Sequence, residues 1–229
     1  MRVFKDFYAY PWVSYRENNC NTVFIDGEVP LIIDPGHTHL FDQVAQGMAR
    51  DGKSVDAVKM VFCTHGHPDH IEAMDQFDES VIKGISKEEC DYLTNGYREL
   101  FLATGCQSPA QSFKVFLREG RIRIGDKTFK VFLTPGHAPG AICLYWEEKK
   151  VLISGDTVFY MGVGRTDLYG GDTALLGESI RRLSQLDVEY LIPGHGEMVQ
   201  GKVTIEKNFK TILDDYFQSS PFGRDERTL

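Results

Sequence analysis

Residues 64–70 place four side chains that bind metals well within six consecutive positions: His65, His67, Asp69 and His70. An apolar run at 58–63 precedes them and predicts a buried strand, and residues 71–77 predict a short helix. Pro68 suits the first turn of that helix, where its missing N–H costs nothing. Because metal affinity depends on ligands that are already in place, a loop held at both ends by regular structure predicts a metal site.

Three more residues that bind metals share one local setting, in which an apolar strand ends and a glycine directly precedes the ligand. They are His137, Asp156 and His195. Glycine lets the backbone turn sharply and approach a ligand closely. We therefore expect four strand ends to converge on one edge of a sheet, with five of the seven histidines of the chain in this setting. His39 lies outside this setting, and we expect it to be an ordinary core or surface histidine.

Seven ligands are too many for one zinc, which usually takes about four. They suit two divalent metal ions about 4 Å apart that share a carboxylate and a water. Nitrogen and oxygen ligands without thiolate fit zinc, iron or manganese, and zinc is our expectation.

The composition narrows the class of partner. A net charge of −8 over 229 residues disfavours a large polyanion such as RNA. No apolar run approaches the length of a membrane span, and the first residues do not resemble a secretory signal. The five cysteines form no CxxC pair, which is typical of a reduced compartment. We expect a cytoplasmic protein with a small-molecule substrate, no nucleic-acid or membrane partner, and a homodimer as the default oligomer.

The remaining pattern predicts one domain over residues 1–229. A β-meander spans residues 3–33, with a hairpin turn at Asp26-Gly27, and a helix follows at 40–50. Later strands are expected at 121–124, 129–133, 141–146, 151–154 and 190–192, with helices at about 173–186 and at 203–217.

Residues 86–118 are the least strand-like part of the chain and predict a helical insertion. Ser86 followed by Glu89 resembles a capping box for a helix that reaches Leu93 or beyond. The insertion can pack on the core, cover the site as a lid, or form a dimer contact, and the pattern does not choose among these.

In these motifs the chain resembles the metallo-β-lactamase-fold superfamily. The order of signatures from about residue 20 to 200 carries the resemblance: Asp34-Pro35-Gly36, residues 64–70, His137, Asp156 and His195. Within that superfamily the stretches 134–140, 154–159 and 164–167 are most similar to the glyoxalase II-like branch. The resemblance implies an α/β (α+β) fold, a four-layer αββα sandwich with the metals at one edge of the paired sheets.

The resemblance also implies a role for each ligand. His65, His67 and His137 would hold the first metal, and Asp69, His70 and His195 the second, with Asp156 between the two. Asp34 would orient a ligand or the loop at 64–70. The alternative for Asp34 is a residue that caps a tight turn.

Three departures from related branches shape the expected substrate. Glyoxalase II continues beyond its last histidine into a helical domain with basic residues for glutathione, whereas only one predicted helix and a tail follow His195, so a glutathione thioester is not the expected substrate. Asp156 stands where lactamases usually have Cys or Ser. His67 stands where flavodiiron oxygen reductases have Glu.

The function that we expect is metal-assisted hydrolysis of a thioester or another activated ester, with Asp69 as a proton shuttle. Tyr160, Arg165 and His37 are candidate substrate contacts. Arg165 can instead pair with Asp167, and Tyr160 can simply pack.

Two other classes compete with the hydrolase. A persulfide dioxygenase-like oxygenase would hold one iron on His65, His137 and Asp156. A nucleic-acid-processing or non-catalytic member of the superfamily is the third class. A nuclease would need a basic groove or an added domain that clamps the substrate, and neither is visible in the sequence. A non-catalytic protein would not need a complete set of seven metal ligands.

Overall fold

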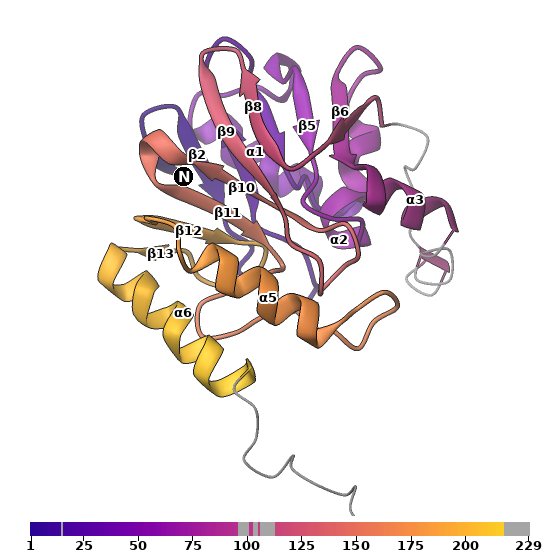
Figure 1. Cartoon of the computed structure of the whole chain (residues 1–229). Helices are drawn as coiled ribbons and strands as arrows, with labels where there is room; N and C mark the ends of the chain where they lie inside the picture. The colour runs from indigo at the N-terminus through magenta and orange to yellow at the C-terminus, as the bar shows by residue number, and fades with distance from the viewer. Residues whose placement is uncertain (15, 96–100, 103–104, 106–112, 218–229) are drawn as a thin grey trace, which may run out of the picture.

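Two β-sheets pack face to face, with helices on both outer faces, in the computed structural model of the chain (Figure 1). The structure describes residues 1–14, 16–95, 101–102, 105 and 113–217. This arrangement confirms the expected four-layer αββα sandwich. The layers are visible in Figure 1, where α5 and α6 cover one side and α1, α2 and α3 lie on the other.

Seven strands of the described residues form the first sheet. In spatial order they are β1 (Arg2–Phe4), β2 (Phe7–Tyr10), β3 (Thr22–Ile25), β4 (Leu31–Ile33), β5 (Met60–Phe62), β6 (Ile82–Ser86) and β7 (Val115–Leu117). The first four strands pair antiparallel, which confirms the meander, and the pairs from β4 to β7 are parallel.

Six strands of the described residues form the second sheet. In spatial order they are β13 (Val199–Gln200), β12 (Tyr190–Pro193), β11 (Val151–Gly155), β10 (Ile142–Trp146), β9 (Lys127–Leu133) and β8 (Gly120–Ile124). β11 and β12 pair parallel, and the other neighbours pair antiparallel. The two-residue strand β13 was not expected from the sequence.

Strand side chains divide between two buried faces. Phe7 and Ala9 of β2 point between the sheets, while Tyr8 and Tyr10 point toward the helices. β10 divides in the same way, since Leu144 lies between the sheets and its neighbours Cys143 and Tyr145 lie under α5 and α6. Because both faces are covered, the central strands have continuous apolar runs rather than alternating ones.

Helices supply the two outer layers. Those on the first sheet are α1 (Phe41–Arg50), α2 (Pro68–Ile71), the 3₁₀ segment Glu72–Gln76 and α3 (Lys87–Asn95). Those on the second sheet are α5 (Thr173–Leu183) and α6 (Lys202–Phe217). Pro68 lies in the first turn of the helix after the loop, as expected, and the helix tightens from an α-helix into a 3₁₀ helix after Ile71. Short 3₁₀ segments also occur at Thr38–Leu40, Val55–Ala57 and Glu147–Lys149.

The segment at 86–118 is helical only in part. The predicted helix is present as α3, and Ser86 Oγ accepts a hydrogen bond from Glu89 N at 3.1 Å, as an N-cap does. The last residues of the segment form strand β7 instead of helix, because Val115–Leu117 pairs with β6 at the edge of the first sheet. Residues 96–100, 103–104 and 106–112 lie outside the described residues, as does the tail expected after 217.

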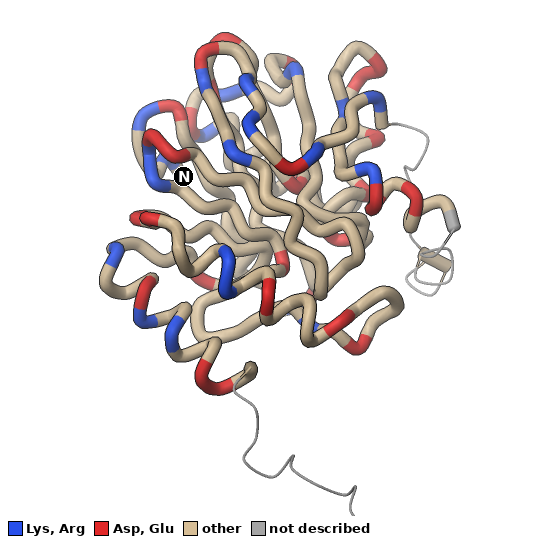
Figure 2. Tube along the Cα trace, in the orientation of Figure 1, with Lys and Arg blue, Asp and Glu red and all other residues tan. Residues whose placement is uncertain are grey.

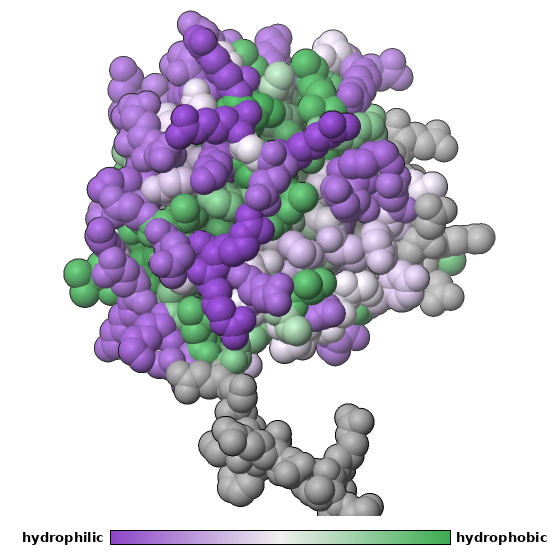
Figure 3. Space-filling view, viewed as in Figure 1, coloured by the Kyte–Doolittle hydropathy of each residue, from purple (hydrophilic) through white to green (hydrophobic). Residues whose placement is uncertain are grey.

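The outer surface is polar in character. Acidic and basic residues lie along the outer sides of α5 and α6 and in the hairpin loops, while the central strands carry few (Figure 2). On the face in Figure 3, hydrophobic residues form small separate areas among hydrophilic ones. None of the helices among the described residues is long and apolar enough to cross a membrane.

Candidate metal centre

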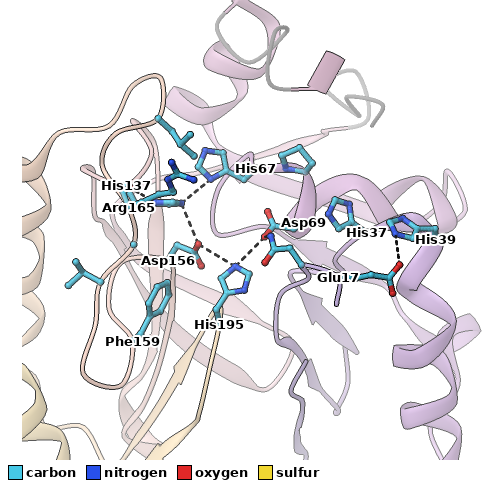
Figure 4. A pocket seen from close by; sticks show the side chains of 15 residues that line it. Glu17, His37, His39, His67, Asp69, His137, Asp156, Phe159, Arg165 and His195 are labelled. Atoms are coloured by element: carbon cyan, nitrogen blue, oxygen red, sulfur yellow. Dashed lines mark hydrogen bonds and ion pairs between the residues drawn. The ribbon is translucent and has the colours of Figure 1, made fainter. Parts of the chain in front are cut away.

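Loops at one edge of both sheets bring the predicted ligands together, and Figure 4 labels His67, Asp69, His137, Asp156 and His195 among them. Because β4 and β5 are parallel, Asp34 and the loop after Phe62 leave the first sheet at the same edge. The parallel pair β11 and β12 likewise delivers Asp156 and His195, and His137 lies in the turn between β9 and β10.

Main-chain hydrogen bonds fasten the two sheets at this edge. Ile142 N donates to Thr64 O at 2.8 Å, and Asn21 N donates to Gly194 O at 2.6 Å. The side chain of Asn21 also donates to Pro193 O at 2.9 Å. Loops from distant parts of the sequence are therefore held in register where the ligands meet.

Three imidazole nitrogens form a first group, here called the first trio: His65, His67 and His137. His65 Nε2 lies 3.1 Å from His67 Nδ1 and 3.2 Å from His137 Nε2. His137 Nε2 lies 2.9 Å from His67 Nδ1. All three side chains are buried.

A second group, here called the second trio, contains Asp69, His70 and His195. His195 Nε2 lies 3.2 Å from Asp69 Oδ2 and 3.3 Å from His70 Nε2. Asn18 Nδ2 donates to the same Asp69 oxygen at 2.6 Å and so helps to fix it.

Asp156 lies between the two trios. Its Oδ2 is 3.4 Å from His137 Nε2 of the first trio and 3.4 Å from His195 Nε2 of the second. Its Oδ1 is 3.3 Å from His70 Nε2. One carboxylate therefore faces donors of both groups.

This donor set fits two cations. Ligands about 2.0–2.1 Å from a tetrahedral metal lie about 3.3 Å from one another. The donor–donor distances given above, from 2.9 to 3.4 Å, match that separation. Neighbouring imidazole nitrogens without a shared proton repel one another, so the arrangement is one that a cation would stabilise. Nitrogen and oxygen donors suit zinc, iron and manganese alike.

Hydrogen bonds on the far side of the rings set which nitrogen faces the centre. His137 Nδ1 donates to Arg165 O at 2.7 Å, which leaves the Nε2 lone pair free to bind a metal. His70 Nδ1 lies 3.1 Å from Asp34 Oδ2, and His65 Nδ1 lies 3.1 Å from Thr64 Oγ1. Such outer contacts fix ring orientation and raise the basicity of a ligand.

Asp34 supports both the loop and a ligand. Its Oδ1 accepts from Thr64 N at 2.7 Å, and its Oδ2 accepts from Thr64 Oγ1 at 2.8 Å in addition to facing His70. Its backbone has a φ of +54°, which is uncommon for a residue with a side chain. This geometry matches the expected orienting role, and the contacts reach well beyond its own turn.

The two trios differ in electrostatics. Burial lowers the pKa of His67 to about 3 and also lowers the pKa values of His65 and His137, so that their rings are neutral. Burial acts in the same direction on His195, but Asp156 and Asp69 outweigh it and raise the pKa of His195 to about 9. Asp156 and Asp34 raise that of His70 in the same way, against its burial.

Glycines before the ligands serve two separate needs. Gly155 has a φ of +48°, a left-handed conformation that glycine adopts without strain. A Cβ on Gly194 would lie 2.1 Å from Asp156 Oδ1 and 2.8 Å from His70 Cε1, so a side chain there would occupy the centre itself.

The centre opens into a cavity of about 780 Å³. Ligands from both trios line it, and so do His37, Arg165 and Phe159. The guanidinium of Arg165 donates two 2.7 Å hydrogen bonds to Asp167, which is the expected internal pair. His37 faces the cavity, and its Nδ1 lies 2.9 Å from Glu72 Oε2.

Tyr160 is not among the residues that line this cavity. A bridge between Phe159 and Gly162 turns the loop tightly, and Tyr160 lies exposed at its tip together with Met161. From this loop the cavity is lined by Phe159, whose ring meets the His195 ring edge-on at 6.0 Å between centroids.

Sequence reasoning missed three polar residues that build the centre. Asn18 and Asn21 are not among the predicted site residues, yet Asn18 contacts Asp69 and Asn21 contacts the His195 loop. Glu89 was read as part of a helix cap, yet its carboxylate reaches two loops of the centre. His39, expected to be ordinary, is exposed at the cavity mouth within 4.8 Å of His37 and Glu72.

The fold and the donor set define a metallo-β-lactamase-type protein, and the comparisons agree. The chain belongs to the metallo-β-lactamase superfamily, whose family model matches residues 15–195. It is similar to hydroxyacylglutathione hydrolase GloC of Haemophilus influenzae, with 31% identity over 199 residues that cover 80% of this chain and 88% of that protein. A probable metallo-hydrolase of Methanocaldococcus jannaschii is 31% identical over 186 residues, or 78% of this chain and 88% of that one.

A solved structure of TTHA1623 in a di-iron-bound form is also similar. It superposes with a TM-score of 0.69 at 27% identity and covers 89% of this chain and 96% of that one. The similarity to hydroxyacylglutathione hydrolases confirms the resemblance to the glyoxalase II-like branch.

Proposed function

We propose that the protein is a dinuclear metallo-hydrolase that cleaves a thioester or another activated ester. The observation that carries this proposal is the position of Asp156, whose Oδ2 lies 3.4 Å from a donor nitrogen of each trio at the floor of an open cavity. A single-metal centre has no need of a carboxylate placed equally between two complete donor sets.

Two divalent cations on these residues would supply a hydroxide nucleophile near neutral pH and would polarise the scissile carbonyl. The chain itself supplies orientation. The first trio presents neutral rings, and the contacts of His137 with Arg165 O and of His70 with Asp34 fix the donor nitrogens before a ligand arrives.

Asp69 is the residue that we assign to proton transfer. It lines the cavity, and its Oδ2 is held by Asn18 and faces His195. A carboxylate in this position can take a proton from the nucleophile and pass it to the departing group. A thiolate leaving group needs little such help, which favours thioesters and activated esters over amides.

Related proteins support the proposal. The GloC relative is named a hydroxyacylglutathione hydrolase, which is a thioesterase, and TTHA1623 is described in a di-iron-bound form. We propose zinc as the resident cation, and iron and manganese fit the same donors.

The test combines metal content with turnover. Protein purified without added metal is subjected to elemental analysis, and hydrolysis of a thioester panel is followed with and without a chelator. We expect about two cations per chain, thioester turnover, and loss of that turnover on chelation.

Other results would replace this function with a different one. One iron per chain together with oxygen uptake on glutathione persulfide would identify an oxygenase. Cleavage of nucleic acid without thioester turnover would identify a nuclease. Full thioester activity in protein stripped of metal would exclude the mechanism.

A further inference from the structure

Glu89 is a buried carboxylate that belongs to neither trio. It lies in the first turn of α3, and its side chain is fully shielded from solvent. A charged carboxylate is costly to bury unless it accepts several hydrogen bonds. Two of the partners of this one lie outside its own helix.

The two oxygens of Glu89 accept hydrogen bonds from two separate loops. Oε1 accepts from Gly66 N at 2.8 Å, and Oε2 accepts from Gly140 N at 2.7 Å. Gly66 lies between His65 and His67, and Gly140 lies three positions after His137. Both loops that carry the first trio are thus fastened to one carboxylate.

Neighbouring contacts leave little freedom at this junction. Ser86 Oγ donates to Gly140 O at 2.5 Å, so Ser86 and Glu89 together bind the C=O and the N–H of that residue. A Cβ on Gly140 would lie 2.3 Å from Glu89 N, and one on Gly66 would lie 3.0 Å from Glu89 Oε1. The helix and the two loops are therefore packed without room for a side chain.

We propose that Glu89 is a positioning residue for the first cation site. Its carboxylate holds the two loop amides at a fixed separation, which brings His137 to within 3.2 Å of both His65 and His67. The inference rests on the proposed two-cation centre. It predicts that loss of the carboxylate weakens the site formed by the first trio and spares the site formed by the second.

Glu89→Gln is the most specific test of this role. The carboxamide keeps the shape of the side chain, but its NH₂ group replaces one acceptor and would face an amide N–H. Outer-contact substitutions of this kind typically lower metal affinity by about 10–100-fold. Exposed Glu88→Gln on the same turn is the matched control.

The zinc affinity of each site is measured separately by competition with a chromophoric chelator. His195→Gln disables the second site and reports on the first, whereas His137→Gln disables the first and reports on the second. We expect Glu89→Gln to weaken zinc about 10–100-fold in the His195→Gln background and less than about threefold in the His137→Gln background. Glu88→Gln should change neither affinity by more than about threefold.

The outcomes separate the two proposals. If the His195→Gln and His137→Gln proteins do not each bind one zinc, the two-cation centre is wrong. If each binds one but Glu89→Gln changes neither affinity, or changes both equally, the role of Glu89 is wrong. If Glu89→Gln does not fold, Glu89→Asp replaces it, because the shorter side chain keeps the charge but cannot reach both amides.

Discussion

The carboxylate of Asp34 lies 3.1 Å from the ring of His70, and the same oxygen accepts a hydrogen bond from the Thr64 hydroxyl. The residue thus connects the end of β4 to the beginning and the end of the loop at 64–70. Its effect on the centre can be separated from its effect on the backbone, because asparagine also tolerates a positive φ.

Asp34→Asn should lower the affinity of the second cation about 10–100-fold, because an amide NH₂ opposite His70 Nδ1 favours the ring tautomer whose Nε2 carries the proton. Stepwise chelator titration measures this loss. Asp56→Asn, at an exposed aspartate in the 3₁₀ segment Val55–Ala57, is the control and should behave as wild type. Unchanged affinity in Asp34→Asn would remove Asp34 from the centre.

Gly194→Ala should abolish binding of at least one cation and reduce turnover more than about 100-fold, since the new methyl group would overlap Asp156 Oδ1 and crowd His70. Gly162→Ala is the matched control, because the nearest atom to a Cβ there is 3.9 Å away. Elemental analysis of both variants checks the result. A Gly194→Ala protein with its full metal content would contradict the close approach that the structure gives.

Phe159→Ala should raise KM several-fold while metal content stays constant, because the ring forms part of the cavity wall beside His195 but binds no cation. Tyr160→Ala, at the exposed tip of the same loop, should change KM by less than about twofold. Steady-state kinetics on the thioester found active decides between them. A larger effect at Tyr160 would restore the original expectation for that residue.

Metal uptake should release protons. In the metal-free protein Asp156 and Asp69 raise the pKa of His195 to about 9 against the effect of burial, and that of His70 is raised as well. The His195 ring is therefore charged at pH 7.5, and a cation must displace its proton. The number released should fall as the pH rises past 9, where His195 is already neutral.

Calorimetry in two buffers of different ionisation enthalpy measures this release. The apparent binding enthalpy should depend on the buffer at pH 7.5 and depend less on it at pH 9.5. Equal heats in both buffers at pH 7.5 would mean that the rings are neutral before the metal binds.

Much of the centre could be predicted from sequence because its signals are local. The spacing at 64–70 and the glycine before each of His137, Asp156 and His195 indicated seven ligands, and the structure brings all seven to one edge. Most strands of both sheets were also predictable, because apolar runs bounded by turn residues are a local property.

The rest depends on contacts that sequence spacing does not encode. Glu89 has the spacing of a capping box, and only the fold reveals that its carboxylate turns away from its own helix to distant amides. Tyr160 and Phe159 are adjacent aromatic residues, and which of them faces the cavity depends on a two-residue bridge. Val115–Leu117 was missed as strand because its pairing partner supplies the stabilising contacts.

Each trio takes two side chains from the part of the chain that forms the first sheet and one from the part that forms the second. A cation at either position would therefore cross-link the two halves of the fold. It would add to the hydrogen bonds between Asn21 and Gly194 and between Ile142 and Thr64. Metal binding and the packing of the two sheets are then thermodynamically linked. A change that separates the sheets would lower the affinity for metal, and removal of the metal would weaken the packing of one sheet on the other.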